Sequence, residues 1–394
     1  MELQDICSYV KTKVETSNYS IEDYISTENM LPEKGGITVA SSFPSGKVTE
    51  FQENDILISN IRPYFKKIWK ADRRGCCSND VLCIRANNNV DAEFLYYLLS
   101  QDLFFAYVMS GANGSKMPRG DKRQIMNWEI EIPSEKEDQR RIASILSSLD
   151  RKIELNNKIN ADLEKMAQAI FKNWFVDFEP FKDGKFVDSE LGMIPEGWKV
   201  VTLDDLTSKF GTGLNPRKNF VLGHGNNYYV TIKNMGNNRI YLNDRCDKVD
   251  DEALAKINKR SKLQKGDLLF SGIGTIGRVA MVVDDPINWN TSESVFNMHP
   301  IDTVSSEFIY LLLLSDKFQQ YVQQNAQGGV QQGIRMASLK AFQFAIPNDL
   351  KLFDNLVKPI ISKVKSNDKE NDTLSLLRDA LLPRLMSGEL EVPE

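Results

Sequence analysis

The chain has 394 residues, 41% of them hydrophobic and 26% charged, which is long enough for two or more globular domains. Its net charge of −5 excludes a uniformly basic nucleic-acid binder but allows local basic clusters. With five cysteines that form no C-x-x-C pair, two histidines and no apolar run near the ~20 residues of a membrane span, we expect a cytoplasmic protein without disulfides, zinc or membrane contact.

In chain order, the first half of the sequence reappears in the second half. The strand-like run "ENDILISNI" resembles "KGDLLFSGI", and the helix-like run "AEFLYYLLSQDLF" resembles "SEFIYLLLLSDKF". Four such matches keep the same order and a nearly constant separation, which predicts two copies of one domain rather than two unrelated domains. The matched pairs are 53–61 with 265–273, 92–104 with 306–318, 127–146 with 341–360, and 3–6 with 203–206.

A long amphipathic helix is predicted after the first repeat. Ser134 is a candidate N-cap, and Glu137 completes a capping box. Apolar residues then recur in steps of three and four, so one helix could extend about 60 Å. The predicted stripe is Ile142, Leu146, Leu149, Ile153, Ile159, Leu163, Met166, Ile170 and Trp174.

A second helix is predicted after the second repeat. Pro359 and the polar run "KSNDKEND" (365–372) predict a kink or a break in it. If the two helices pair antiparallel, they separate the two globular repeats about a pseudo-twofold axis, either as a DNA spacer or as a purely structural coiled coil. The predicted stripe is Leu352, Leu356, Ile360, Val364, Leu374, Leu377, Leu381 and Leu385.

The segment "GDLLFSGIGTIGRV" (266–279) contains a G-x-G-x-x-G spacing at Gly272, Gly274 and Gly277. A dinucleotide loop would continue into a helix, but "RVAMVVDD" favours a second strand. The repeat also aligns these glycines with "NIRPYF" (60–65), which has none. We therefore predict a β-hairpin turn, with Arg278 opposite Lys66 as a candidate DNA contact.

Basic residues cluster in "RPYFKKIWKADRR" (62–74), a density that suits phosphate neutralisation, although a solvated hairpin face is the alternative. Two Gly-rich loops, "SGANGSKMPRGDKR" (110–123) and "QNAQGGVQQGIR" (324–335), occupy corresponding positions in the repeats. Amide and guanidinium groups there could read base edges, unless the loops have simply drifted. The candidate DNA-binding residues are Arg62, Lys66, Lys67, Arg73, Arg74, Ser115, Lys116, Arg119, Gln331, Gln332, Arg335 and Arg278, with Lys233 and Asn234 as weaker ones.

The sequence carries no motif for catalysis. An amino-methyltransferase would need an Asn/Asp-Pro-Pro-aromatic motif, and "LNPRKN" (214–219) is the nearest match and fails. No G-x-x-x-x-G-K-[ST] phosphate loop is present either. We expect a binding protein without catalytic or metal-ligating residues.

A family resemblance now becomes visible. "IPSEKEDQRRIASILSSLDRKIELNNKI", "AIFKNWFVDFEP" and "LGMIPEGWKVVTLDDL" resemble the central region of specificity subunits of type I restriction–modification enzymes, and "LLPRLMSGEL" resembles their ending. Two departures are that Phe353 stands where the first helix has Gln139, and that no "IPEGW" precedes "LQDI" (3–6), so the N-terminal edge is expected to pack differently.

The resemblance implies an α+β protein in which two pseudo-repeated α/β target-recognition domains are separated by two antiparallel helices forming a coiled-coil spacer. The implied domains are target-recognition domain 1 (1–133), the central conserved helix (134–175), a connecting segment (176–199), target-recognition domain 2 (200–347) and the C-terminal conserved helix (348–394).

The resemblance also implies a non-catalytic subunit that reads a bipartite double-stranded DNA target. Two modification subunits, which methylate adenine N6 with S-adenosylmethionine, and restriction subunits, which use ATP and magnesium, are the implied partners, and this chain itself would hold no cofactor. The residues alone leave two alternatives open: a self-sufficient nucleic-acid methyltransferase using the glycine loop, or a helical scaffold with protein-binding globules.

Overall fold

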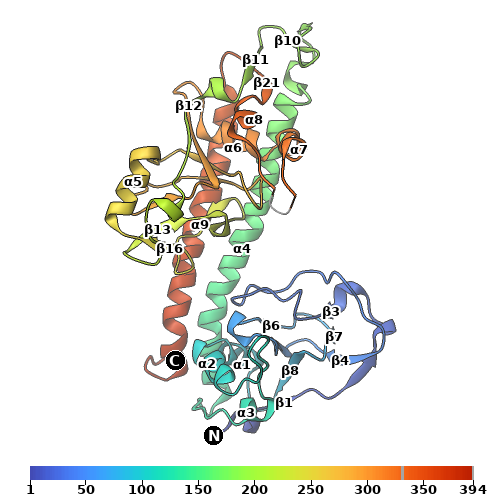
Figure 1. The fold of residues 1–394 in the computed structure, drawn as a ribbon. Helices are drawn as coiled ribbons and strands as arrows, with labels where there is room; N and C mark the ends of the chain where they lie inside the picture. The colour runs from blue at the N-terminus through green and yellow to red at the C-terminus, as the bar shows by residue number, and fades with distance from the viewer. Residues whose placement is uncertain (330–331, 393–394) are drawn as a thin grey trace. The chain divides into compact units, whose positions relative to one another are not determined.

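A computed structural model describes residues 1–329 and 332–392. It divides the chain into two compact units, unit 1 with residues 1–156 and 369–394 and unit 2 with residues 157–368. Two long helices, α4 (Lys136–Phe175) and α9 (Lys351–Met386), contribute one part to each unit. Figure 1 shows these helices in green and red.

Unit 1 contains one complete repeat. Among its described residues, two four-stranded sheets have the strand orders β1-β8-β5-β6 and β2-β4-β7-β3. The strands are β1 (Cys7–Tyr9), β2 (Lys13–Glu15), β3 (Tyr24–Ile25), β4 (Lys47–Phe51), β5 (Ile56–Ser59), β6 (Ile68–Lys70), β7 (Gly75–Cys77) and β8 (Val81–Ala86). The α-helices that follow are α1 (Ala92–Leu99), α2 (Asp102–Ser110) and α3 (Lys122–Met126).

Unit 2 contains the other repeat. In its described part, a four-stranded sheet has the order β12-β20-β17-β18 and a three-stranded sheet has the order β16-β13-β19, beside the ladders β9–β10, β11–β21 and β14–β15. The strands are β9 (Phe186–Val187), β10 (Ile194–Pro195), β11 (Lys199–Thr202), β12 (Thr207–Thr212), β13 (Asn227–Val230), β14 (Met235–Gly236), β15 (Arg239–Ile240), β16 (Asp247–Val249), β17 (Leu268–Ser271), β18 (Val279–Met281), β19 (Trp289–Thr291), β20 (Val295–Pro300) and β21 (Gln343–Ile346). The helices are α5 (Asp251–Ser261), α6 (Ser306–Leu314), α7 (Asp316–Asn325) and α8 (Met336–Lys340).

The predicted repeat is confirmed by two sheets of the same topology, β1-β8-β5-β6 in unit 1 and β12-β20-β17-β18 in unit 2. In unit 1, β5 pairs antiparallel with the long strand β8 on one side and with the short strand β6 on the other. In unit 2, β17 pairs in the same way with β20 and β18. The expected difference at the N-terminal edge is also present. Strand β11 pairs with β21 over four residues, whereas unit 1 has a single bridge between Glu2 and Glu129.

The central strand of each repeat is apolar throughout because it faces two separate cores. Ile56 and Ile58 of β5 pack with α1, while Leu57 between them packs into a core with the second sheet. Strand β17 repeats this arrangement, since Leu268 and Phe270 join one core and Leu269 joins another. A strand buried on both faces reads as a continuous apolar run instead of an alternating one.

Helices α4 and α9 run antiparallel within each unit, as predicted (Figure 1). In unit 1, Asp150 of α4 bonds Arg378 of α9 at 2.7 Å, and further along α4 Asn156 bonds Asn371, which comes earlier on α9. In unit 2, the Phe171 and Phe353 rings are 6.0 Å apart. Asp150 also accepts from the Tyr97 hydroxyl (2.7 Å) and so ties α1 to the helix pair.

The structure corrects the predicted break in the second helix and the first part of its predicted apolar stripe. Helix α9 is continuous through Pro359 and residues 365–372, so no break occurs. Its predicted apolar stripe is out of phase in the first turns, where Leu352 and Leu356 are exposed and Phe353, Val357 and Ile361 are buried instead, whereas the predicted members Val364 and Leu385 are buried. Both phases contain apolar residues at helical spacing, so the period alone could not choose between them. On α4, the predicted stripe member Met166 is likewise 52% exposed.

Asparagines form a buried polar layer where the apolar stripes of the helix pair are interrupted. In unit 1, Asn156 Nδ2 donates to Glu370 Oε2 (2.8 Å) and Asn371 Oδ1 (2.9 Å). In unit 2, Asn367 Nδ2 donates to Asn160 Oδ1 (2.8 Å), and Asn160 Nδ2 donates to the Val364 carbonyl (3.3 Å). Each of these Nδ2 groups has an acceptor across the helix pair, as buried donors require, while Asn367 Oδ1 has no partner among the described residues.

Candidate nucleic-acid interface

The turn after β5 and the first Gly-rich loop lie against each other in unit 1. The backbone N–H of Arg62 donates to the Pro118 carbonyl (2.8 Å), and Ile61 and Arg119 form a β-bridge. The loop is closed by Asn113 and Arg119, which exchange two backbone hydrogen bonds of 2.9 Å. We call residues 60–67 and 111–120 the first tip.

Unit 2 builds the same arrangement from the turn after β17 and the second Gly-rich loop. The N–H of Gly274 donates to the Gln332 carbonyl (2.7 Å), and Ile273 forms a β-bridge with Gly333. Gln327 and Gly333 exchange two backbone bonds of 2.8 Å. We call residues 272–278 and 326–335 the second tip. Its predicted member Gln331 lies outside the described residues.

The glycines of the G-x-G-x-x-G spacing have local structural reasons. They join β17 to β18 in an antiparallel hairpin, as predicted, and no helix follows to hold a dinucleotide phosphate. Gly274 and Gly277 have φ of 89° and 93°, and a Cβ on Gly272 would lie 2.5 Å from the Phe296 ring. The arrangement removes the support for a cofactor loop.

The first tip adopts the same left-handed conformations without glycine. Arg62 and Lys66 both have φ of 50°, and they flank the short turn Pro63–Phe65. A long side chain in this region costs about 1–2 kcal/mol, because its Cβ crowds the following carbonyl. The turn therefore holds two basic residues in a strained backbone where the second repeat has glycines.

The predicted alignment of Arg278 with Lys66 is wrong by one residue. Ser59 donates its N–H to the Lys67 carbonyl (3.1 Å), and Ser271 donates to the Arg278 carbonyl (2.9 Å) at the same point of the hairpin. Arg278 therefore corresponds to Lys67. The turn of the second repeat is one residue shorter, which an alignment without gaps could not reveal.

Lys67 and Arg278 each hold a neighbouring turn by its backbone. Lys67 Nζ donates to the Thr27 carbonyl (2.6 Å), and Arg278 Nη1 donates to the Ile232 and Met235 carbonyls (2.8 and 2.5 Å). Burial lowers the pKa of the Lys67 ammonium. Both side chains thus position a turn, a role that leaves less of each charge for a phosphate.

The turns that they hold are repeated as well. Asn29 Oδ1 accepts from the Ser26 N–H (2.6 Å), and Asn234 Oδ1 accepts from the Thr231 N–H (2.9 Å). Asn234 is only 4% exposed, so the side chain predicted to contact DNA is instead buried within its own turn. Its neighbour Lys233 is exposed. The shared pattern S/T-x-x-N was the sequence signal for this turn, and we did not identify it.

The remaining predicted residues fall into two groups. Ser115, Lys116 and Arg119 are exposed on the first tip, where Arg119 pairs with Asp80 (3.2 Å). Gln332 and Arg335 are exposed on the second tip, and Arg335 is the residue before α8. Each tip therefore gathers polar and basic side chains from two segments that are far apart in the sequence.

Arg73 and Arg74 do not join the first tip. They lie in the connection from β6 to β7, at the opposite end of β6 from the turn. Arg74 pairs with Glu50, and Arg73 pairs with Asp72 (2.8 Å) and donates to the Glu22 carbonyl (3.0 Å). Their charge is used within the unit.

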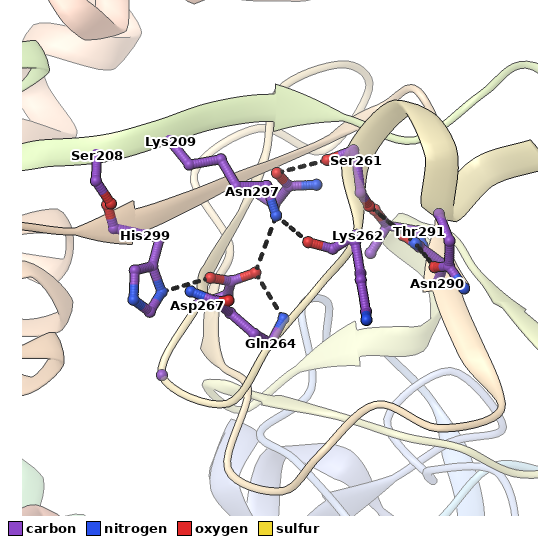
Figure 2. A network of polar contacts seen from close by, with 12 residues as sticks. Ser208, Lys209, Ser261, Lys262, Gln264, Asp267, Asn290, Thr291, Asn297 and His299 are labelled. Carbon is purple, nitrogen blue, oxygen red and sulfur yellow. Dashed lines mark hydrogen bonds and ion pairs between the residues drawn. The ribbon is translucent and has the colours of Figure 1, made fainter.

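A buried aspartate stands at the start of the strand leading to each tip. In unit 1, the Asp55 carboxylate accepts two bonds of 2.7 Å from Arg85. In unit 2, Asp267 accepts from the Gln264 N–H (3.0 Å) and lies 2.8 Å from His299 Nδ1, with the Lys209 ammonium at 3.7 Å (Figure 2). Burial raises the pKa of the Asp267 carboxyl, which its cationic neighbours and the Gln264 amide oppose.

Two exposed side chains at the first tip were missed by the sequence analysis. Tyr64 is 45% exposed between the two strained residues, and Met117 is 48% exposed in the Gly-rich loop. The available signal was a run of aromatic residues among lysines. The basic residues of this segment were predicted to contact DNA, but the rings between them were not among the predicted contacts.

Metal and membrane sites do not emerge from the described residues. Residues 1–329 and 332–392 contain no group of three or more His, Cys, Asp or Glu side chains arranged to hold a metal ion. Within the same residues, no helix is both long and apolar enough to cross a bilayer.

Comparisons with known proteins agree with the duplicated architecture. Residues 1–165 and 195–369 match the family described as type I restriction modification DNA specificity domain. The chain is 30% identical to the type I restriction enzyme MjaIX specificity subunit of Methanocaldococcus jannaschii, over 78% of this chain and 71% of that protein. It is 26% identical to the HindI specificity subunit of Haemophilus influenzae, over 98% of each protein.

A solved structure shares the fold. The type I restriction–modification S subunit from M. genitalium superimposes with a TM-score of 0.57 at 15% identity, over 98% of this chain and 95% of that one. At this identity the likeness concerns the fold alone.

Proposed function

Since the chain belongs to the type I restriction–modification DNA specificity family and is a non-catalytic specificity subunit, we propose that each of its repeats reads one half of a bipartite DNA target. The observation that carries the proposal is the duplicated tip. Two scaffolds with the same strands, bridges and left-handed turns present different side chains at the same positions. The different side chains of the two tips would recognise different half-sites.

The chemistry of the tips suits duplex DNA. Lys116 and Arg119 of the first tip are exposed cations for phosphates or for guanine, which arginine can hold through two hydrogen bonds. Gln332 and Arg335 of the second tip offer an amide for adenine and a guanidinium for guanine. Backbone at Gly274 can approach the DNA closely because no side chain stands there.

The partners follow from the family. Modification subunits, two of them, would dock on α4 and α9 and supply S-adenosylmethionine chemistry at adenine N6, and restriction subunits would supply ATP- and magnesium-dependent cleavage. This chain would hold none of these cofactors. The helix pair would also set the unread spacer between the half-sites, and its asparagine layer supports a fixed pairing register.

Methylome sequencing tests the division of labour. DNA from cells that carry the chain with its modification subunits should show a bipartite methylated motif. Replacing residues 200–347 by the equivalent segment of another specificity subunit should change one half of that motif and leave the other intact. A change in both halves, or in neither, would contradict the proposal.

A separate measurement tests the spacer. Four residues inserted into α4, about one helical turn, should lengthen the unread spacer while both half-sites stay the same. Loss of all methylation by a complex that still assembles would show that the helix pair does not act as a spacer.

A further inference from the structure

The turn of the first tip carries an aromatic side chain at its most exposed point. Tyr64 lies between Arg62 and Lys66, whose left-handed backbone shapes the turn. In the second repeat the corresponding residues are Thr275 and Ile276, between two glycines. Strained backbone of this kind persists where the surrounding structure enforces it, and it is concentrated at functional sites.

Two segments that bond this turn also carry exposed apolar side chains. Met117 belongs to the loop that bonds Arg62, and Leu103 follows Asp102, which pairs with Lys66 at 2.9 Å. Their exposed fractions are 48% and 67%, beside 45% for Tyr64. The turn and the two segments bonded to it therefore each expose one apolar side chain.

The same segments carry cations, of which Lys66 and Arg119 also pair with Asp102 and Asp80, and cations here favour an anionic partner. Lys66, Lys116 and Arg119 lie on the two segments that carry Tyr64 and Met117. The Arg62 guanidinium contributes a buried Nε for which the described residues provide no acceptor. An apolar point within a basic rim suits the floor of a DNA groove between two phosphate backbones.

We propose that Tyr64 contacts the 5-methyl group of a thymine in the half-site read by the first repeat. This inference rests on the proposed function and adds one base contact to it. The methyl group is the apolar feature of the major groove, and apolar side chains recognise thymine through it.

Contact with a base edge suits the geometry better than insertion between bases. The Tyr64 ring packs against Phe65 with centroids 4.7 Å apart, and only 45% of the residue is exposed. Its short turn is tied to the Gly-rich loop and to residues 33–34 by backbone bonds of 2.8 to 3.0 Å. A ring held in this way can touch a methyl group but cannot extend into the base stack.

The test replaces thymine by uracil, which removes the methyl group and keeps every hydrogen bond. The full chain, assembled with its modification subunits, is titrated with duplexes that carry its methylated motif, at one fixed salt concentration. For the wild type, one thymine-to-uracil change in the first half-site should weaken binding about fourfold. Tyr64→Ala should weaken binding to the thymine duplex about tenfold and should bind thymine and uracil duplexes equally.

Two controls separate this contact from general damage. Tyr64→Phe keeps the ring and should keep the preference for thymine. Ile287→Ala truncates a side chain that is 83% exposed in unit 2, and it should leave both affinities unchanged. Thermal melting of each variant verifies that the fold is intact.

The outcomes distinguish the inference from the proposed function. A first half-site without any A·T pair would overturn the thymine contact, as would a thymine preference that survives in Tyr64→Ala or is absent from the wild type. These results leave bipartite recognition intact. A wild-type complex that binds its motif no better than a scrambled duplex would overturn the proposed function itself.

Discussion

The two tips place positive φ angles at corresponding positions with different residues. The second tip uses Gly274 and Gly277, for which a positive φ has no steric penalty, whereas the first tip keeps Arg62 and Lys66 in that conformation. Beneath them, the same position of the strand pair is filled by Arg85 in unit 1 and by His299 in unit 2. The two units therefore share backbone features at these positions, while the residues that occupy them differ in side chain and in charge.

The largest difference between the units is expected at the buried aspartates. Arg85→Ala should lower the free energy of unfolding of unit 1 by about 2 kcal/mol, because the buried Asp55 carboxylate keeps the Gln52 N–H but loses its cation, whose own side chain is partly exposed. His299→Ala should cost about 1 kcal/mol in unit 2, since Asp267 keeps the Lys209 ammonium in addition to the Gln264 N–H. Urea unfolding, with hydrogen exchange at β5 and β17, assigns each loss to its unit. An equal loss in both units would refute the comparison.

Exchanging the residues of the two turns should reveal the backbone strain. Gly274→Arg should destabilise unit 2 by about 1–2 kcal/mol, because arginine is forced to a positive φ. Arg62→Gly should leave unit 1 unchanged or stabilise it by up to about 1 kcal/mol, since relief of strain is offset by the freedom of glycine in the unfolded chain. Thermal unfolding measures both. Destabilisation of unit 1 by Arg62→Gly would show that the arginine side chain holds the turn.

Salt dependence of DNA binding separates two arginines of the first repeat. Arg62→Ala should reduce the slope of log Kd against log salt by about one unit if its guanidinium contacts a phosphate. Arg74→Ala should leave the slope unchanged, because Arg74 pairs with Glu50 away from the tip. The opposite result would move the DNA contact to the β6–β7 connection.

The smallest effect is a pH dependence confined to unit 2. Burial raises the pKa of Asp267, so the folded unit keeps this proton over a pH range in which the unfolded chain has lost it. The resulting stability is complete below the ordinary aspartate pKa of about 3.9 and is lost as the pH rises through the raised value. Asp267→Asn should therefore gain stability relative to the wild type across this range. Parallel pH profiles of the two proteins would contradict the assignment.

Much of the architecture could be predicted because it is written in local patterns. The apolar runs of β5 and β17, the helix-forming segments after them and the valines after Gly277 each indicated their element. Their recurrence in one order predicted the duplication, and the missing glycines in "NIRPYF" indicated a hairpin in place of a cofactor loop. These inferences depend on residues close together in the chain.

The errors arose where tertiary contacts decide. Leu352 and Phe353 are both apolar, and Phe353 is the buried one because it packs among the rings of Phe171, Trp174, Phe175 and Phe308. The polar segment 365–372 resembles a helix break in the sequence, but in the structure Asn367 donates a hydrogen bond to Asn160 of the other helix. Arg278 was aligned one residue away because a shortened turn leaves no mark in either sequence. Asn234 was taken for a DNA contact because its bond to Thr231 depends on a three-dimensional turn.

The asparagine layer also restricts the helix pair to particular registers of α9 against α4. A slip of one residue along α9 in unit 2 would take Asn367 away from Asn160 and bury an unpaired amide, which costs about 1–3 kcal/mol. An all-leucine seam would tolerate such a slip much better, because apolar contacts have no direction. The pairing therefore resists gradual sliding. A change in the register of the two helices is therefore favourable only if it places another hydrogen-bonding partner opposite each buried asparagine.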